Sequence, residues 1–179
     1  AYNKPTQTGL ESHFVPVAEN CGLPICLYNV PSRTAISLAP ETIESLAVLP
    51  NVHAIKEATT DMVRAALVAE ACGDNATVMA GDDAVFLPML ALGAGGIVSA
   101  AANVIPEAFV QLYKTYRWST VSEARPIHSR WLGVIRSLYE VVNPVGVKTA
   151  TLMRGWIESD EVRLPLVGMS DSERDALRT

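Results

Sequence analysis

Short apolar runs alternate with longer amphipathic stretches through the first part of the chain. Four runs are nearly continuous in apolar residues, which is typical of parallel strands covered on both faces. Each run precedes a stretch with the three-to-four-residue spacing of a helix. The predicted strands span residues 25–28, 52–55, 77–80 and 96–99, and the predicted helices span 9–20, 40–49, 60–72 and 83–92. This order predicts right-handed βαβ units and a parallel sheet.

The alternation of strand-like runs and helical stretches ends after residue 102, where three helical stretches follow one another without a strand. They span residues 106–118, 121–142 and 145–156, and a short last helix follows Asp171. Ser170 or Asp171 can cap that last helix, and Glu173 can complete a capping box. We therefore expect an α/β part with the chemistry in residues 1–118 and a helical subdomain in residues 119–179.

Four strands are too few for a closed eight-stranded (β/α) barrel, which usually takes about 250 residues. Two architectures agree with the pattern: a small open α/β sheet, or a barrel whose first half is not in this chain.

Composition narrows the classes of function. Hydrophobic residues make up 49% and charged residues 18% of the chain, as in globular proteins. The net charge is −5 with no basic block, which disfavours nucleic-acid binding, and the apolar stretches are too short for a membrane span. Three cysteines without paired spacing favour reduced thiols in a cytoplasmic protein over a disulfide framework or a zinc site.

Lys56 is the strongest candidate for chemistry among the four lysines. It ends a strand-like run, so we expect it at the C-terminal edge of the sheet, where α/β active sites gather. Partial burial there disfavours the ammonium form, and a neutral amine can attack a carbonyl. The alternative is a lysine whose stem is buried and whose head pairs with Glu57 or another acid.

The segment Tyr28-Asn-Val-Pro-Ser-Arg-Thr34 after the first strand carries two further candidates. A phenol at a strand end can relay protons, and Arg33 can bind a carboxylate. The alternative is a turn fixed by Pro31, with the Tyr28 hydroxyl satisfied in the core.

Other polar motifs are interpreted as structural. Asp82 and Asp83 stand at a strand-to-helix turn, where helix capping is favoured over a metal pair. The glycine-rich segment 93–96 precedes a strand instead of linking a strand to a helix, which favours a tight turn over a phosphate loop. The three histidines have no ligand spacing, so no metal site is predicted.

Several motifs occur in a recognisable order: Tyr2-Asn-Lys-Pro5, Tyr28-Asn-Val-Pro-Ser-Arg-Thr34, Ile55-Lys-Glu-Ala-Thr59, Gly81-Asp-Asp83 and Gly95-Gly-Ile-Val-Ser99. They resemble the motifs of the dihydrodipicolinate synthase (4-hydroxy-tetrahydrodipicolinate synthase) family of pyruvate-dependent class I aldolases. The resemblance covers nearly the whole chain, down to Arg163-Leu-Pro165. It implies a TIM (β/α)8 barrel, of which this chain is the C-terminal part, with strands five to eight and a C-terminal helical subdomain.

The resemblance also implies roles for single residues. Lys56 would form the imine with pyruvate, and Tyr28 would transfer protons and position the intermediate. Tyr2 matches a family tyrosine that reaches into the neighbouring subunit's site to complete a proton relay. Arg33 would bind the carboxylate of the aldehyde substrate. The main-chain groups of Gly81 and Val98 would lie against the pyruvate end of the site.

The implied reaction condenses pyruvate with L-aspartate 4-semialdehyde in lysine and diaminopimelate biosynthesis. It needs no metal or organic cofactor, because the lysine imine is the electron sink. A homo-oligomer built as a dimer of dimers is the implied assembly. The family's Gly-Thr-Thr-Gly-Glu segment, which carries the relay threonine, does not occur in this chain.

Two alternatives stay open. The first is another pyruvate aldolase or lyase of the superfamily that includes N-acetylneuraminate lyase, acting on a sugar acid. Arg33 favours the synthase, because the sugar-acid lyases generally lack an arginine there. The second is a non-catalytic chain that only packs or oligomerises, and it predicts no imine on Lys56.

Overall fold

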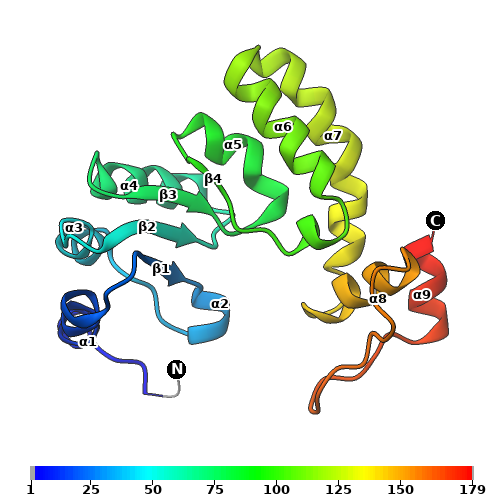
Figure 1. Ribbon diagram of the computed structural model, residues 1–179, viewed down its shortest axis with the longest axis horizontal. Coiled ribbons are helices and arrows are strands. Elements are labelled where there is room, and N and C mark those ends of the chain that lie inside the picture. The colour runs from blue at the N-terminus through cyan, green and yellow to red at the C-terminus, as the bar shows by residue number, and fades with distance from the viewer. Residues whose placement is uncertain (1–2, 179) are drawn as a thin grey trace. The chain divides into compact units, whose positions relative to one another are not determined.

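A four-stranded parallel sheet in the order β1-β2-β3-β4 organises residues 3–98 (Figure 1). Its strands are β1 (Ile25–Asn29), β2 (Val52–Glu57), β3 (Thr77–Ala80) and β4 (Gly96–Ile97). The computed structural model describes residues 3–178, so Ala1, Tyr2 and Thr179 lie outside the described residues. All four predicted strands and their parallel order are confirmed.

Helices connect the strands as the βαβ pattern requires. Helix α1 (Gln7–Asn20) precedes β1, and the connecting helices are α2 (Pro31–Thr34), α3 (Pro40–Ala47), α4 (Met62–Cys72) and α5 (Phe86–Ala91), with a 3-10 turn at Asp83–Val85. Asp61 caps α4 by accepting from the backbone N–H of Val63 and Arg64, and Gly73 ends it with φ +48°. Asp82 accepts from the N–H of Ala84, which confirms the predicted capping role. The last predicted helix of this part therefore begins as a 3-10 turn and becomes α-helical at Phe86.

Only one face of the sheet is covered by helices within this part of the chain. Figure 1 shows α1, α3, α4 and α5 along one side of the sheet. Burial alternates toward the C-terminal ends of β1, β2 and β3, where the covered face buries Leu27, Asn29, Ile55, Glu57, Val78 and Ala80. The other face, called the open face here, carries Cys26, Tyr28, Ala54, Lys56, Thr77 and Met79, none of which is buried.

The expectation of strands covered on both faces is therefore wrong for residues 3–98. Cys26, Ala54 and Met79 are apolar, so the sequence pattern looked continuous although the burial alternates. An open face lined by apolar side chains is what the inner surface of an incomplete barrel would present.

The core under the covered face is made of large apolar side chains from β2, α3, α4 and α5. Ile43, Leu46, Ile55, Val68 and Phe86 are all at most 1% exposed. The helical members follow the three-to-four-residue spacing from which their helices were predicted, and Ile55 lies in one of the predicted apolar runs.

Cys72 lies in the same core, at the end of α4. Burial raises the pKa of the Cys72 thiol to about 11, and the negative charge of Glu57 adds to the increase. Its sulfur is therefore a neutral apolar group in the folded protein.

Residues 99–178 form a second, helical unit. It contains a 3-10 turn (Ala101–Asn103) and the helices α6 (Pro106–Trp118), α7 (Val121–Leu138), α8 (Val145–Met153) and α9 (Asp171–Arg178). The predicted range of α6 is confirmed, whereas α7 and α8 end earlier than predicted. Ser170 caps α9: its N–H donates to the Glu173 carboxylate at 2.7 Å, and the N–H of Glu173 returns to Ser170 Oγ at 3.4 Å. This reciprocal pair is the predicted capping box.

Asp160 ties the segment after α8 to two helices of the same unit. Thr149 Oγ1 donates to its carboxylate at 2.8 Å, and Arg174 NH2 lies 2.7 Å away. Burial by itself raises the pKa of Asp160, but these two hydrogen bonds and the positive charge of Arg174 outweigh burial and hold it below its usual range.

The chain divides into compact units between Val98 and Ser99, so that α6 belongs to the helical unit. The family resemblance places the start of the helical subdomain after residue 118, which is a different boundary from the division into compact units. That boundary stays a prediction. No helix among residues 3–178 is long and apolar enough to span a membrane.

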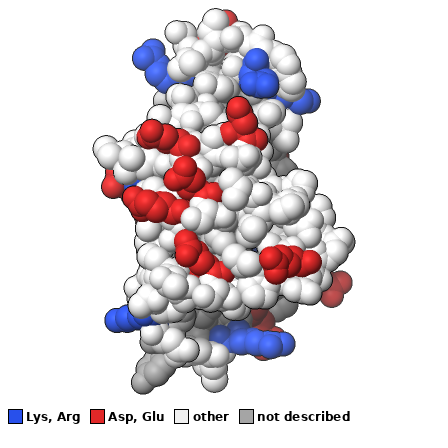
Figure 2. Space-filling model, turned by 90° about the vertical axis from the view of Figure 1, so that its left-hand side faces the viewer, with Lys and Arg blue, Asp and Glu red and all other residues white. Residues whose placement is uncertain are grey.

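The outer helices of the first unit are acidic. Helices α1, α3 and α4 together carry Glu11, Glu19, Glu41, Glu44 and Glu70 but only one basic residue, Arg64. Figure 2 shows carboxylates gathered on the side of the molecule where these helices lie. Such a surface repels the phosphate backbone of nucleic acids.

Candidate active site

Tyr28 and Lys56 lie side by side on the open face of the sheet. They occupy paired positions of β1 and β2, one residue before the C-terminal end of each strand. Lys56 Nζ stands 4.0 Å from the centroid of the Tyr28 ring. The Tyr28 side chain is 48% exposed, so its hydroxyl is not a satisfied core group, as the structural alternative required. The predicted amine and the predicted phenol are thus brought together.

The neighbour Glu57 is not the partner of Lys56. Side chains alternate along a strand, so Glu57 points to the covered face, where it is fully buried and lies 3.0 Å from Arg64 NH2. Within residues 3–178, no carboxylate forms an ion pair with Lys56. The alternative interpretation, in which the lysine head pairs with Glu57, is wrong.

Arg33 lies on the short helix α2, directly after β1. Pro31 occupies the first turn of α2 and presets its backbone, and Ala35 ends it with φ +55°, in the left-handed region. The expected turn at Pro31 is therefore a single helical turn. It places the exposed Arg33 in its last turn, beyond the same strand end that carries Tyr28.

Gly81 follows β3 and lies against the end of β2. Its N–H donates to Glu57 O at 2.9 Å, and a Cβ at this position would lie 2.9 Å from Ala58 Cα. Val98 follows β4, and its N–H donates to Ala80 O at 3.0 Å. Both N–H groups are used by the sheet, so the backbone groups that Gly81 and Val98 can offer a ligand are their carbonyls.

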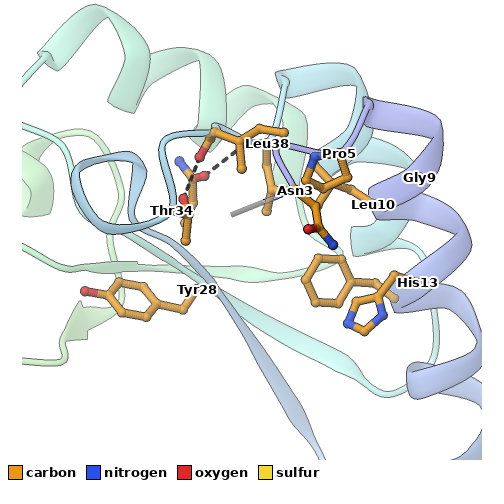
Figure 3. Close-up of a pocket in the computed structure, with 11 residues that line it drawn as sticks. Asn3, Pro5, Gly9, Leu10, His13, Tyr28, Thr34 and Leu38 are labelled. Atoms are coloured by element: carbon orange, nitrogen blue, oxygen red, sulfur yellow. Dashed lines mark hydrogen bonds between the residues drawn. The ribbon is translucent and has the colours of Figure 1, made fainter. Parts of the chain in front are cut away.

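A cavity of about 670 Å³ lies at the C-terminal end of β1. Eleven residues from the N-terminal segment, α1, β1, the end of α2 and the segment that follows α2 line it: Asn3, Pro5, Gly9, Leu10, His13, Phe14, Tyr28, Asn29, Thr34, Ile36 and Leu38. Figure 3 shows Tyr28 at one side of this cavity and His13 at the other, with the phenol oxygen pointing away from His13. Tyr28 is thus the site residue that connects the open face to this cavity.

A buried polar cluster behind the site was missed from the sequence. Asn29 Nδ2 donates to both carboxylate oxygens of Glu57, at 3.0 and 2.9 Å, and Arg64 NH2 donates to Glu57 Oε2 at 3.0 Å. Asn29 and Glu57 are paired residues of β1 and β2. The sequence does contain a signal for this cluster. Asn29 and Glu57 each directly follow a predicted site residue, and each lies two residues after a buried apolar strand residue, so their side chains point to the covered face.

Two further expectations concern other groups. Tyr2, the expected proton-relay residue, lies outside the described residues. Among residues 3–178, no group of three or more His, Cys, Asp or Glu side chains could hold a metal ion. The predicted groups that the structure places at or beyond these strand ends are the amine of Lys56, the phenol of Tyr28 and the guanidinium of Arg33.

Known proteins with similar sequences and folds agree on one family. The 4-hydroxy-tetrahydrodipicolinate synthase of Geotalea daltonii is 45% identical over 176 residues, which cover 98% of this chain and 60% of that protein. A monomeric dihydrodipicolinate synthase variant superposes with a TM-score of 0.94 at 34% identity, over 99% of this chain and 60% of that one. The chain thus spans about 60% of the length of the curated relatives that it matches.

The chloride-inhibited dihydrodipicolinate synthase of Acinetobacter baumannii, in complex with pyruvate, is also similar. It superposes with a TM-score of 0.94 at 35% identity, over 99% of this chain and 60% of that one. The model of the dihydrodipicolinate synthetase family matches residues 1–179. The protein whose open face carries Lys56 and Tyr28 therefore belongs to the dihydrodipicolinate synthetase family.

Proposed function

We propose that this chain contributes strands five to eight of a (β/α)8 barrel and catalyses the condensation of pyruvate with L-aspartate 4-semialdehyde through a Schiff base on Lys56. The observation that carries the proposal is the placement of Lys56. Its amine lies on the open face at a C-terminal strand end, 4.0 Å from the Tyr28 ring centroid and without an ion pair among residues 3–178. Active sites of (β/α)8 barrels lie at this end of the strands.

The barrel assignment accounts for the open face. In a closed barrel the inward side chains of all strands pack in layers, so the apolar side chains of the open face would become interior. The similarity to dihydrodipicolinate synthases over 99% of this chain and about 60% of theirs supports the assignment.

The first half of the reaction makes a nucleophile from pyruvate. The neutral amine of Lys56 attacks the keto carbon of pyruvate, and the carbinolamine loses water to give a protonated imine. The positive imine nitrogen accepts electrons as the methyl group loses a proton, which forms an enamine. Tyr28, beside the amine, transfers these protons, and Tyr2 completes the relay to solvent from a neighbouring subunit.

The second half joins the two substrates. The enamine carbon attacks the aldehyde of aspartate semialdehyde, whose carboxylate is held by Arg33. The amino group of the new chain then attacks the imine carbon and displaces Lys56, which closes the ring and releases the enzyme. The carbonyls of Gly81 and Val98 lie against the pyruvate end of the site. All steps are carried by side chains, so no cofactor takes part.

The proposed protein acts in the cytoplasm as a homo-oligomer built as a dimer of dimers. The family resemblance supports the assembly, and the role given to Tyr2 requires a second subunit. Because the chain is also similar to a monomeric dihydrodipicolinate synthase variant, the oligomeric state has to be measured. Analytical ultracentrifugation of the chain would give it directly, and a monomer at all concentrations would refute this part of the proposal.

The decisive experiment traps the imine. The folded chain is incubated with pyruvate and borohydride, and its intact mass is measured. Only four lysines occur, so Lys56→Ala and a matched Lys114→Ala variant separate the site from a lysine on the exposed surface of α6. We expect one reduced pyruvate adduct on the parent and on Lys114→Ala, and none on Lys56→Ala. An unmodified parent that is folded by circular dichroism would refute the proposal and favour the non-catalytic alternative.

The aldehyde substrate needs a separate test. Without borohydride, the folded chain is incubated with pyruvate and aspartate semialdehyde, or with a substrate of the sugar-acid aldolases, and product formation is followed by mass spectrometry. Because Arg33 is expected to hold a carboxylate, Arg33→Ala should lower turnover of aspartate semialdehyde and leave imine formation intact. Turnover of the sugar acid alone would identify the other branch of the superfamily.

A further inference from the structure

Behind Lys56 and Tyr28, the covered face contains a charged group with an unusual degree of burial. Glu57 is 0% exposed and accepts hydrogen bonds from Asn29 and Arg64, at distances between 2.9 and 3.0 Å. Removing one partner of a buried charge is strongly destabilising, and the hydrogen bonds to the Glu57 carboxylate restrict the geometry of the groups that make them, although Arg64 Nε has no hydrogen-bond partner among residues 3–178. The cluster therefore holds its three side chains in one arrangement.

The register of the sheet places this cluster directly behind the proposed site. Asn29 pairs with Glu57, and the preceding residues Tyr28 and Lys56 pair with each other. Asn29 and Glu57 are each joined through one peptide unit to a site residue, and their side chains point to the opposite face. Any shift between the ends of β1 and β2 would therefore change the 4.0 Å spacing between the Lys56 amine and the Tyr28 ring.

The same cluster also fixes the segment that returns from α2. Asn29 Oδ1 accepts from the N–H of Leu38 at 2.9 Å, and Arg64 NH2 donates to Leu38 O at 2.8 Å. Gln7 holds the same segment from α1: it donates to Ser37 O and accepts from the N–H of Ala39, both at 2.9 Å. The helical turn that carries Arg33 is thus anchored on its C-terminal side.

From these contacts we infer that Asn29, Glu57 and Arg64 form a positioning cluster, which sets the amine of Lys56 relative to Tyr28 and to the turn of Arg33. The inference rests on the proposed function, because it assigns the cluster a role in imine formation. The three residues do not touch the substrate, and they act through the strand ends that they join. Small displacements of a reacting group can lower a rate by about a hundredfold, so such a cluster has a measurable effect.

The test exchanges donor and acceptor across the Asn29–Glu57 contact. In Glu57→Gln, the new amide meets the Asn29 amide, so two donors compete for one acceptor in a buried site. In the Asn29→Asp/Glu57→Gln double variant, the position 29 carboxylate accepts from the Leu38 N–H and from the new amide. The amide oxygen at position 57 accepts from Arg64. The hydrogen bond between positions 29 and 57 is then restored with its direction reversed, while the hydrogen bonds from the Leu38 N–H and from Arg64 keep their direction.

Asn51→Ala is the matched control at the other end of the same strands. Asn51 Nδ2 donates to Ala18 O and Cys21 O, at 2.8 and 2.9 Å, just before β1 and β2 begin. Its loss removes two partly buried hydrogen bonds from the same unit without reaching the C-terminal strand ends. A general loss of stability would affect this variant as well.

Rates of imine trapping are measured over a range of pyruvate concentrations and expressed per folded molecule. We expect Glu57→Gln to lower the rate at saturating pyruvate by roughly tenfold or more, with a smaller change in the half-saturating concentration. The double variant should recover to within about threefold of the parent, and Asn51→Ala should match the parent. A stability effect alone would change the folded fraction and leave the rate per folded molecule unchanged.

The outcomes separate the inference from the proposed function. A parent with a Lys56-dependent adduct, whose rate is unchanged in Glu57→Gln, would overturn the inference and leave the function standing. A slow Glu57→Gln variant that is not rescued in the double variant would also overturn it. A parent without any adduct would refute both, because no attack by Lys56 would then exist to be positioned.

Discussion

The contact between Gly81 and the end of β2 permits a quantitative prediction. A Cβ at position 81 would lie 2.9 Å from Ala58 Cα and 2.9 Å from Glu57 O. Nonbonded carbon atoms prefer separations of about 3.5–4.0 Å, so relief requires a movement of about 0.6 Å or more. Both obstructing atoms belong to the backbone, and the Gly81 N–H bond to Glu57 O holds the two strands together. Gly81→Ala should therefore lower the free energy of unfolding by about 1–3 kcal/mol, as overpacking does.

Gly22→Ala is the matched control for this substitution. Gly22 lies in the same unit, has no atom within 4 Å of the added Cβ, and has a φ outside the left-handed region. Because alanine restricts the unfolded chain, this variant should gain about 0.4–1 kcal/mol. Urea unfolding followed by far-ultraviolet circular dichroism would measure both. Equal changes, or a Gly81→Ala variant within about 0.5 kcal/mol of the parent, would refute the close approach of the strands.

Two further predictions concern titrating groups. With its pKa raised to about 11, the Cys72 thiol is roughly one part in a thousand thiolate at pH 8, so iodoacetamide should label the exposed Cys26 while Cys72 reacts only after unfolding. Mass mapping would check this, and equal labelling of both cysteines in the folded protein would contradict it. Because its pKa is lowered in the folded state, the Asp160 carboxylate stabilises the protein above the unfolded value near 3.9, and this stabilisation is lost as the pH falls through the folded value. Asp160→Asn should therefore lower the free energy of unfolding at pH 7 and change it little near pH 2. Tryptophan fluorescence would follow the unfolding, since all three tryptophans lie in residues 99–178. An equal loss of stability at both pH values would count against this account.

Local signals explain why many elements were predictable. The ends of α4 and α9 are set by residues within one turn of the helix: Asp61 and Gly73 for α4, and Ser170 with Glu173 for α9. Pro106 begins α6 at the predicted residue. The apolar runs gave the strands, and the βαβ order gave their parallel arrangement. Errors occurred where apolar residues occupied exposed positions, as in the open face of the sheet.

The family, the parallel α/β order and the candidacy of Lys56 could be inferred from the sequence, because the motifs and the strand ends are contiguous segments of the chain. The pairing of Tyr28 with Lys56 depends on the register between strands, which the tertiary structure decided. The tertiary structure also decided two contacts of Glu57. One is with Asn29, which lies 28 residues away along the chain, and the other is with Arg64 on a different element. A carboxylate next to a lysine in sequence looks like its ion-pair partner. The side chains of neighbouring strand residues point to opposite faces, so the lysine and the carboxylate do not meet. Only the packed structure showed that Arg64 and Asn29 donate hydrogen bonds to the Glu57 carboxylate.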